Sequence, residues 1–167
     1  MELETLRDLY VEELKDLYSA EKQIIKGLTK MQKAASHPEL KKAFARHQQM
    51  TEKHVERLET ICADLEVSPR GKKCVGMEGL IEEAADLIKE KPDADVLDAG
   101  LIAAAQHVEH YEMAGYGCVR TYAQHLGYSD QANLLQTTLD EEGDTDKLLT
   151  AIAESSINIE AESGRAD

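Results

Sequence analysis

The chain has 167 residues, of which 33 are acidic and 19 basic, so its formal net charge is −14. This length is typical of one domain that is large enough to bury a core. The excess of acid and the lack of a basic stripe argue against direct binding to nucleic acid. The sequence has no apolar run of the length that crosses a membrane, and its acidic start is unlike a signal peptide.

Low aromatic and proline content favours an all-helical protein, since Phe and Trp together contribute one residue and Pro three. The cysteines are Cys62, Cys74 and Cys118, and no two of them form a Cys-x-x-Cys pair. This spacing fits neither a disulfide framework nor a zinc finger. We therefore expect a cytoplasmic protein, because a reducing compartment keeps scattered cysteines free.

The first predicted helix covers residues 3–34. Its inward line, read at alternating steps of three and four residues, carries one charge near its middle, Glu21. The other positions on this line are apolar: Leu3, Leu6, Tyr10, Leu14, Leu17, Ile24, Leu28 and Met31. Glu21 is either an edge residue whose carboxylate reaches water or a buried group that needs a partner.

A break at 36–38 precedes the second predicted helix, residues 39–65, because proline disfavours helix in the residue before it and fits a first turn. Here the inward line has a polar centre of His47, Thr51 and His54 between apolar residues. A single core histidine is usually just hydrogen-bonded. Two of them one heptad apart favour metal ligation, although the sequence does not tell which one binds.

A connector at 67–75 and a short amphipathic helix at 77–90 separate the second long helix from the third. This connection is far longer than a tight turn between antiparallel neighbours. It allows the third long helix to run parallel to the second, which is the connectivity of ferritin-like bundles.

The remaining long helices are predicted at 95–126 and 130–157, followed by a polar tail at 158–167. Glu109 and Glu112 lie on the inward line of the first, and Glu142 and Asp146 on that of the second. The alternative for the last two is a solvated acidic cluster, because residues 140–144 are a dense acidic run. The bundle thus forms one domain over residues 1–157.

The polar residues on the four inward lines are expected at one height in the bundle. Counted from the two turns at about 1.5 Å rise per residue, they fall within about two helical turns of one another. The seven residues are Glu21, His47, His54, Glu109, Glu112, Glu142 and Asp146. No Lys or Arg shares the central part of these lines, so a metal is the expected counter-charge.

Oxygen-rich ligation with a minority of imidazole favours Fe or Mn over structural zinc. Five carboxylates carry more charge than one divalent ion offsets. The sequence therefore predicts two metal ions with a bridging carboxylate.

Three segments, 18–23, 76–84 and 103–112, resemble the YciF-type bacterial stress-protein family of the ferritin-like superfamily. The resemblance covers nearly the whole chain. It implies an all-α, ferritin-like four-helix bundle with a rubrerythrin-like di-metal site, assembled as a homodimer. The usual Glu-x-x-His motif is missing: Thr51 stands three before His54, and Thr145 and Asp146 follow Glu142. The ligand set is thus atypical.

Three functions remain open at this stage. The first is a stress-response protein with a di-iron or di-manganese centre, which, if an enzyme, is an oxidoreductase acting on O2 or peroxide. The second is a cage for iron storage with ferroxidase activity, and the third is a helical interaction module without catalysis. Tyr10 and Tyr111 are the aromatic residues expected nearest the site, either as hydrogen-bond donors to ligands or as ordinary core.

Overall fold

The computed structural model describes residues 3–163, and all regular structure in this range is helical. Five helices make up the body, and a π-helical turn and a short sixth helix follow them. The elements are α1 (Leu6–Ala34), α2 (Pro38–Asp64), α3 (Val75–Glu90), α4 (Ala94–His125), α5 (Ser129–Ile152), η1 (Ala153–Ile157) and α6 (Asn158–Ser163). The predicted all-α class and the four long helices with a short fifth between them are confirmed.

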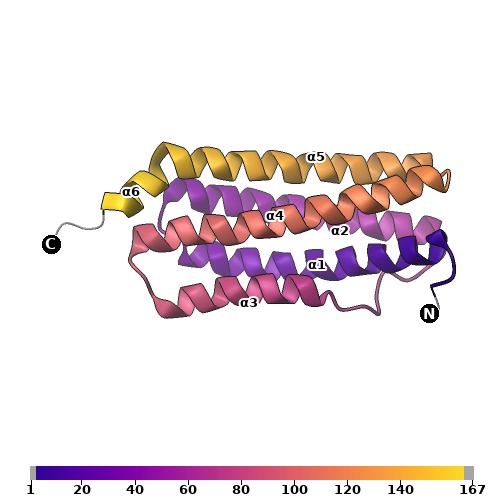
Figure 1. Cartoon of the computed structure of the whole chain (residues 1–167), viewed down its shortest axis with the longest axis horizontal. Helices are drawn as coiled ribbons and strands as arrows, with labels where there is room; N and C mark the ends of the chain where they lie inside the picture. The colour runs from indigo at the N-terminus through magenta and orange to yellow at the C-terminus, as the bar shows by residue number, and fades with distance from the viewer. Residues whose placement is uncertain (1–2, 164–167) are drawn as a thin grey trace.

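The four long helices lie side by side, with α1 and α2 forming one antiparallel pair and α4 and α5 the other (Figure 1). Between the pairs, α3 returns the chain to the opposite end, packed on the outside of α1 and α4. The long crossover therefore makes α4 run in the direction of α2, as ferritin-like connectivity requires.

Two glycines of the bundle lie against side chains of the crossover helix α3. A Cβ on Gly27 of α1 would stand 3.0 Å from Ile81 of α3, and one on Gly100 of α4 would stand 2.5 Å from Leu87. A larger residue at either point would force the Ile81 or Leu87 side chain to move, since side chains in a core fill the available space. The two glycines thus leave room for these side chains of the crossover helix.

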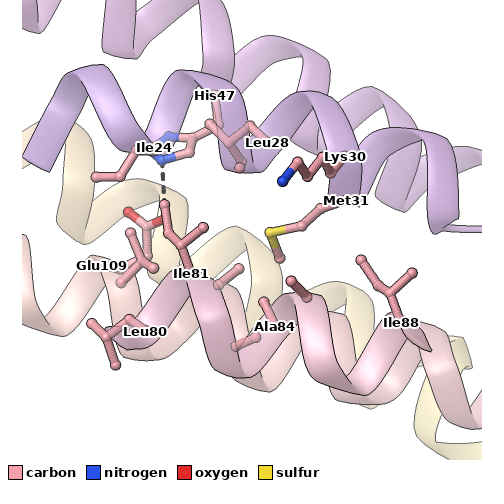
Figure 2. Close-up of a pocket in the computed structure, with 15 residues that line it drawn as sticks. Ile24, Leu28, Lys30, Met31, His47, Leu80, Ile81, Ala84, Ile88 and Glu109 are labelled. Carbon is pink, nitrogen blue, oxygen red and sulfur yellow. Dashed lines mark ion pairs between the residues drawn. The ribbon is translucent and has the colours of Figure 1, made fainter. Parts of the chain in front are cut away.

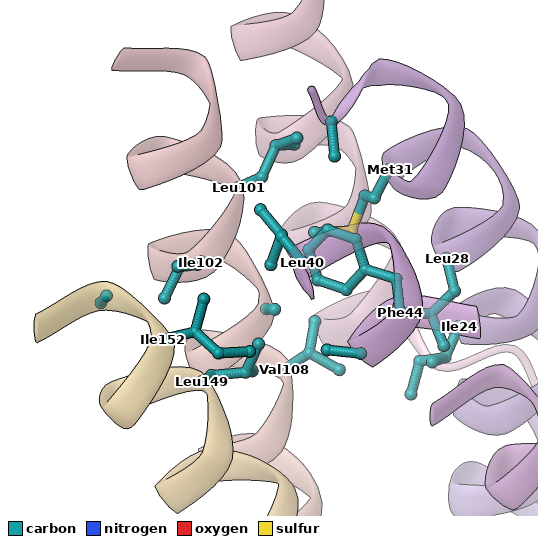
Figure 3. Packing of buried hydrophobic residues seen from close by; sticks show 14 of the residues in the cluster. Ile24, Leu28, Met31, Leu40, Phe44, Leu101, Ile102, Val108, Leu149 and Ile152 are labelled. Carbon is teal, nitrogen blue, oxygen red and sulfur yellow. The ribbon is translucent and has the colours of Figure 1, made fainter. Parts of the chain in front are cut away.

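The apolar core is divided into two clusters, one toward each end of the bundle. The first includes Ile24, Leu28, Phe44 and Leu149 (Figure 3). The second lies toward the other end and includes Leu14, Leu58, Tyr116, Val119 and Leu135. Between them the inward positions of all four long helices are polar, so the middle of the bundle holds a buried polar layer.

Side-chain hydrogen bonds fix the start of α1 and the turn between α1 and α2. Thr5 and Asp8 form a capping box at the start of α1, in which Thr5 Oγ1 accepts from the Asp8 amide at 3.1 Å. Three donors at the α1–α2 turn converge on Asp98 of α4, which is 2 % exposed. Asp98 accepts from the Ser36 amide at 2.8 Å, the Ser36 hydroxyl at 2.6 Å and the His37 amide at 2.7 Å. This buried carboxylate is fully partnered.

The C-terminal segment continues further as helix than the sequence indicates. The tail predicted at 158–167 is helical through Ser163, because the chain passes through η1 and keeps Ile157 in the core. Residues 164–167 of that tail lie outside the described residues. Within the described part of the chain, no helix is both long and apolar enough to cross a membrane.

We predict that Asp98→Ala lowers the free energy of unfolding by about 1–3 kcal/mol, because it strands buried donors at the turn. Urea denaturation of the two proteins measures this difference. Asp86→Ala is the matched control, since Asp86 is exposed and its contact is a surface ion pair with Lys89. An effect of Asp98→Ala no larger than that of the control would contradict the role of Asp98 in holding the α1–α2 turn.

Candidate metal centre

Six of the seven residues expected from the sequence meet in the buried polar layer. They come from all four long helices, and each is at most 3 % exposed. The six are Glu21 of α1, His47 and His54 of α2, Glu109 and Glu112 of α4, and Glu142 of α5.

Their ligand atoms form two groups, within each of which all atoms lie within 4.8 Å of one another. One group consists of His47, Glu109, Glu112 and Glu142, and the other of Glu21, His54 and Glu142. Each group contains one imidazole, and the Glu142 carboxylate belongs to both. Either group therefore has the composition of a metal site, and the Glu142 side chain lies between the two groups.

Short distances join the imidazoles to the carboxylates. His47 Nε2 lies 3.1 Å from Glu109 Oε1. His54 Nδ1 lies 2.9 Å from Glu142 Oε1 and 3.4 Å from Glu21 Oε1. None of these contacts is a hydrogen bond, since His47 Nε2 and His54 Nδ1 both lack a hydrogen-bond partner. The atoms are thus close to one another but unpaired.

Unpartnered atoms are concentrated in this layer. Among the described residues, ten buried side-chain N and O atoms lack a hydrogen-bond partner, and eight of them belong to the six site residues. Both oxygens of Glu112 and both of Glu142 are among them. Buried polar atoms in folded proteins are nearly always partnered, as Asp98 is in this chain. The donor set fits a cation, which would bind several of these atoms at once.

A second set of residues holds the ligands in place. His54 Nε2 lies 3.0 Å from Glu141 Oε2. The Arg57 guanidinium holds both oxygens of Glu141, at 2.5 and 3.1 Å. This fixes the imidazole ring with Nδ1 toward the site, an arrangement typical of metal-binding histidines. Tyr116 donates a hydrogen bond to Glu21.

Burial raises the pKa of three of the site carboxyls. The pKa of Glu109 rises to about 8, that of Glu112 lies well above its ordinary value, and that of Glu142 is also raised. The pKa values of the two imidazoles shift in opposite directions. Burial lowers the pKa of His47. Burial also opposes charge on His54, but Glu142 and Glu21 at its ring outweigh it and raise the pKa of His54 to about 10.

Asp146 does not join either group. Its side chain is 21 % exposed, accepts from Gln106 Nε2 at 3.1 Å and lies 3.3 Å from His110 Nε2. The inward face of α5 passes through Thr145 instead, which is 8 % exposed. Steps of three and four residues along α5 fit either Thr145 or Asp146, and the less polar of the two, Thr145, is the buried one.

Three residues that contact the site were not singled out from the sequence: Arg57, Glu141 and Tyr116. Arg57 follows His54 by three residues, so it lies on the same side of α2, and Glu141 is next to a ligand. Tyr116 lies four residues after Glu112 on the inward line. The tyrosines expected near the site bond elsewhere: Tyr10 donates to Gln131, and Tyr111 donates to Asp16.

We predict that the metal-free chain loses stability as pH rises from 6.5 to 8. In this window the native state keeps protons on Glu109, whose pKa is about 8, and on His54, whose pKa is about 10, whereas the unfolded chain releases them. For each proton that only the native state retains, the free energy of unfolding falls by about 1.4 kcal/mol per unit rise in pH. The lowered pKa of His47 acts only at lower pH, where the unfolded imidazole takes up a proton.

Urea denaturation in the presence of a chelator measures this slope.

Glu112→Gln replaces one buried carboxyl by an amide of similar shape. At pH 8 the metal-free variant should therefore be at least as stable as the wild type. A variant that is less stable at every pH would show that Glu112 is a structural group and contradict the expectation.

Comparison with known proteins agrees with this architecture. The profile of the family described as "Domain of unknown function (DUF892)" matches residues 5–162. Protein YciF of Escherichia coli K12 is 44% identical over 163 residues, which cover 97% of this chain and 98% of that protein. The crystal structure of the E. coli stress protein YciF superposes with a TM-score of 0.90 at 43% identity, covering 94% of this chain and 99% of that one.

A second solved structure, YcfI from Rhodopseudomonas palustris, has a TM-score of 0.86 at 39% identity. It covers 89% of this chain and 95% of its own. Both structures match across almost their entire length, so the chain and these relatives share one helical fold.

Proposed function

The chain belongs to the DUF892 family of YciF-like proteins, and we propose that it binds two Fe or Mn ions in its central polar layer and acts in stress defence. The observation that carries the proposal is the convergence of eight unpartnered ligand atoms on one buried site. A stress role rests on the similarity to the E. coli stress protein.

The charge of the site supports two ions rather than one. With Asp146 outside, the layer holds four carboxylates and two imidazoles. Two divalent cations balance four ionised carboxylates beside two neutral imidazoles. A single divalent ion would leave two buried negative charges, which is costly in a low-dielectric interior.

The residues divide the work of holding the ions. Glu142 would be the ligand common to both ions, His47 with Glu109 and Glu112 would complete one set, and Glu21 with His54 would complete the other. The oxygen-rich set favours Fe or Mn over structural zinc.

Bound Fe or Mn would supply electron transfer toward O2 or peroxide, and the chain would then be a di-metal oxidoreductase. The side chains of the protein would position the ions and neutralise their charge. Glu141 accepts the Nε2 proton of His54 in a hydrogen bond while Nδ1 faces the site. Tyr116 fixes one oxygen of Glu21 and leaves the other, Oε2, without a partner. Metal binding must release protons from Glu109 and His54, so uptake strengthens as pH rises toward 8.

We predict that Glu142→Ala loses uptake of both ions, because it removes the ligand that the two groups share. Elemental analysis after reconstitution with Fe(II) or Mn(II) should give about two metals per wild-type chain and less than about 0.2 per variant chain. Asp146→Ala is the matched control: an acidic residue on the same helix, four positions away and outside both groups. Equal losses in the two variants, or a wild type that takes up no metal, would refute the proposal.

We propose further that the protein is a cytoplasmic homodimer. The three cysteines are all free, which suits a reducing compartment. Light scattering after size-exclusion chromatography should give twice the 18.5 kDa chain mass. A particle of many subunits would instead favour the iron-storage cage.

A further inference from the structure

A narrow apolar cavity lies between α1, α3 and α4 and ends at the proposed metal site. Its walls include Ile24 and Leu28 of α1, Ile81 and Ala84 of α3, and Val108 of α4. Figure 2 shows the side chains of α1 and α3 facing one another across it, with the His47–Glu109 pair at one end and Ile88 toward the other.

The two ends of the cavity differ in character. At the inner end His47 is 3 % and Glu109 1 % exposed, and His47 Nε2 and Glu109 Oε2 have no hydrogen-bond partner. At the outer end Lys30 is exposed and Ile88 is partly exposed, so the cavity reaches the surface there. Apart from Lys30, His47 and Glu109 every lining residue is apolar. Cations and water gain nothing from such walls, because no polar group along the way would bind them.

Charged and polar species have a different approach. A larger pocket of about 200 Å³ reaches His47 from between α2 and α5, and its lining includes Arg46, Asp144 and Thr145. Metal ions and protons can use this polar side, which leaves the apolar cavity for an uncharged ligand.

The apolar walls and the small size of the cavity favour a small uncharged ligand. Its volume of about 20 Å³ exceeds the 10–15 Å³ that one water-sized molecule requires, which is room for a diatomic gas. We infer that this cavity is a binding site and entry path for dioxygen, which delivers it to the His47–Glu109 side of the site. The inference rests on the proposed function, since it names the co-substrate of the same centre.

The test uses the metal-free chain, so that gas binding is measured independently of metal. Xenon, a probe of apolar cavities, should occupy the cavity in pressurised crystals. Dissolved dioxygen should enhance the relaxation of the Ile24 and Ile81 δ1-methyl signals at least fivefold more than that of the exposed Ile159.

Variants that fill the cavity should lower xenon binding and the methyl enhancement, and variants that enlarge it should raise them. Ala104→Leu fills the cavity from α4 and should abolish xenon binding and the methyl enhancement. Ala103→Leu is the matched control, because Ala103 is exposed and outside this cavity. Ile81→Ala enlarges the cavity and should raise xenon occupancy, with Ile24 as the remaining reporter.

Metal content separates this inference from the proposed function. Two metals per chain in Ala104→Leu, together with lost gas binding, is the expected result. A wild type that takes up two metals, binds no xenon and shows no dioxygen enhancement at the Ile24 and Ile81 methyls would overturn the dioxygen path alone. Gas binding in a chain that takes up no metal would overturn the proposed function and retain the cavity as a gas site.

Discussion

Four carboxylates and two imidazoles are buried together at the centre of this bundle, and most of their ligand atoms have no partner. Such a layer costs free energy that an apolar layer would not, because each buried charge loses its hydration. The two apolar clusters on either side must hold the bundle together against that cost. This cost is the reason for our proposal that the layer binds cations, which would compensate it.

The rest of the fold serves to bring these residues to one level. Each long helix has its polar residues near its middle, and the two turns place those middles side by side. The crossover through α3 sets the direction of α4, so that Glu109 and Glu112 face α1 and α2 at the height of Glu21. The same helix forms one wall of the apolar cavity that reaches His47. One connection thus determines both which side chains meet in the polar layer and one wall of the cavity beside it.

Hydrophobic periodicity was sufficient to predict the helices, their order and six of the residues in the layer. A step of three or four residues along a helix keeps a side chain on one face, and buried charges stand out on such a line. The same rule failed at Asp146, because the steps from Glu142 to Leu149 pass equally well through Thr145 or Asp146. Burial of the smaller and less charged residue decides this in the structure.

Hydrophobic periodicity could not predict side-chain contacts between different helices. Arg57 and Glu141 lie beside the inward lines, and only the packing of α2 against α5 brings them together at His54. Asp98 was missed for the same reason, since its donors lie at a turn far away in the sequence. Periodicity reveals which face is buried, but side-chain contacts between helices depend on their rotation and distance.

The most direct measurement is anomalous scattering at the Fe and Mn absorption edges from crystals of the reconstituted protein. The account predicts two peaks in the central layer, both within bonding distance of Glu142, one beside His47 and the other beside His54. A map with no peak there after reconstitution with either metal, and with these side chains bonded only to one another, would contradict it.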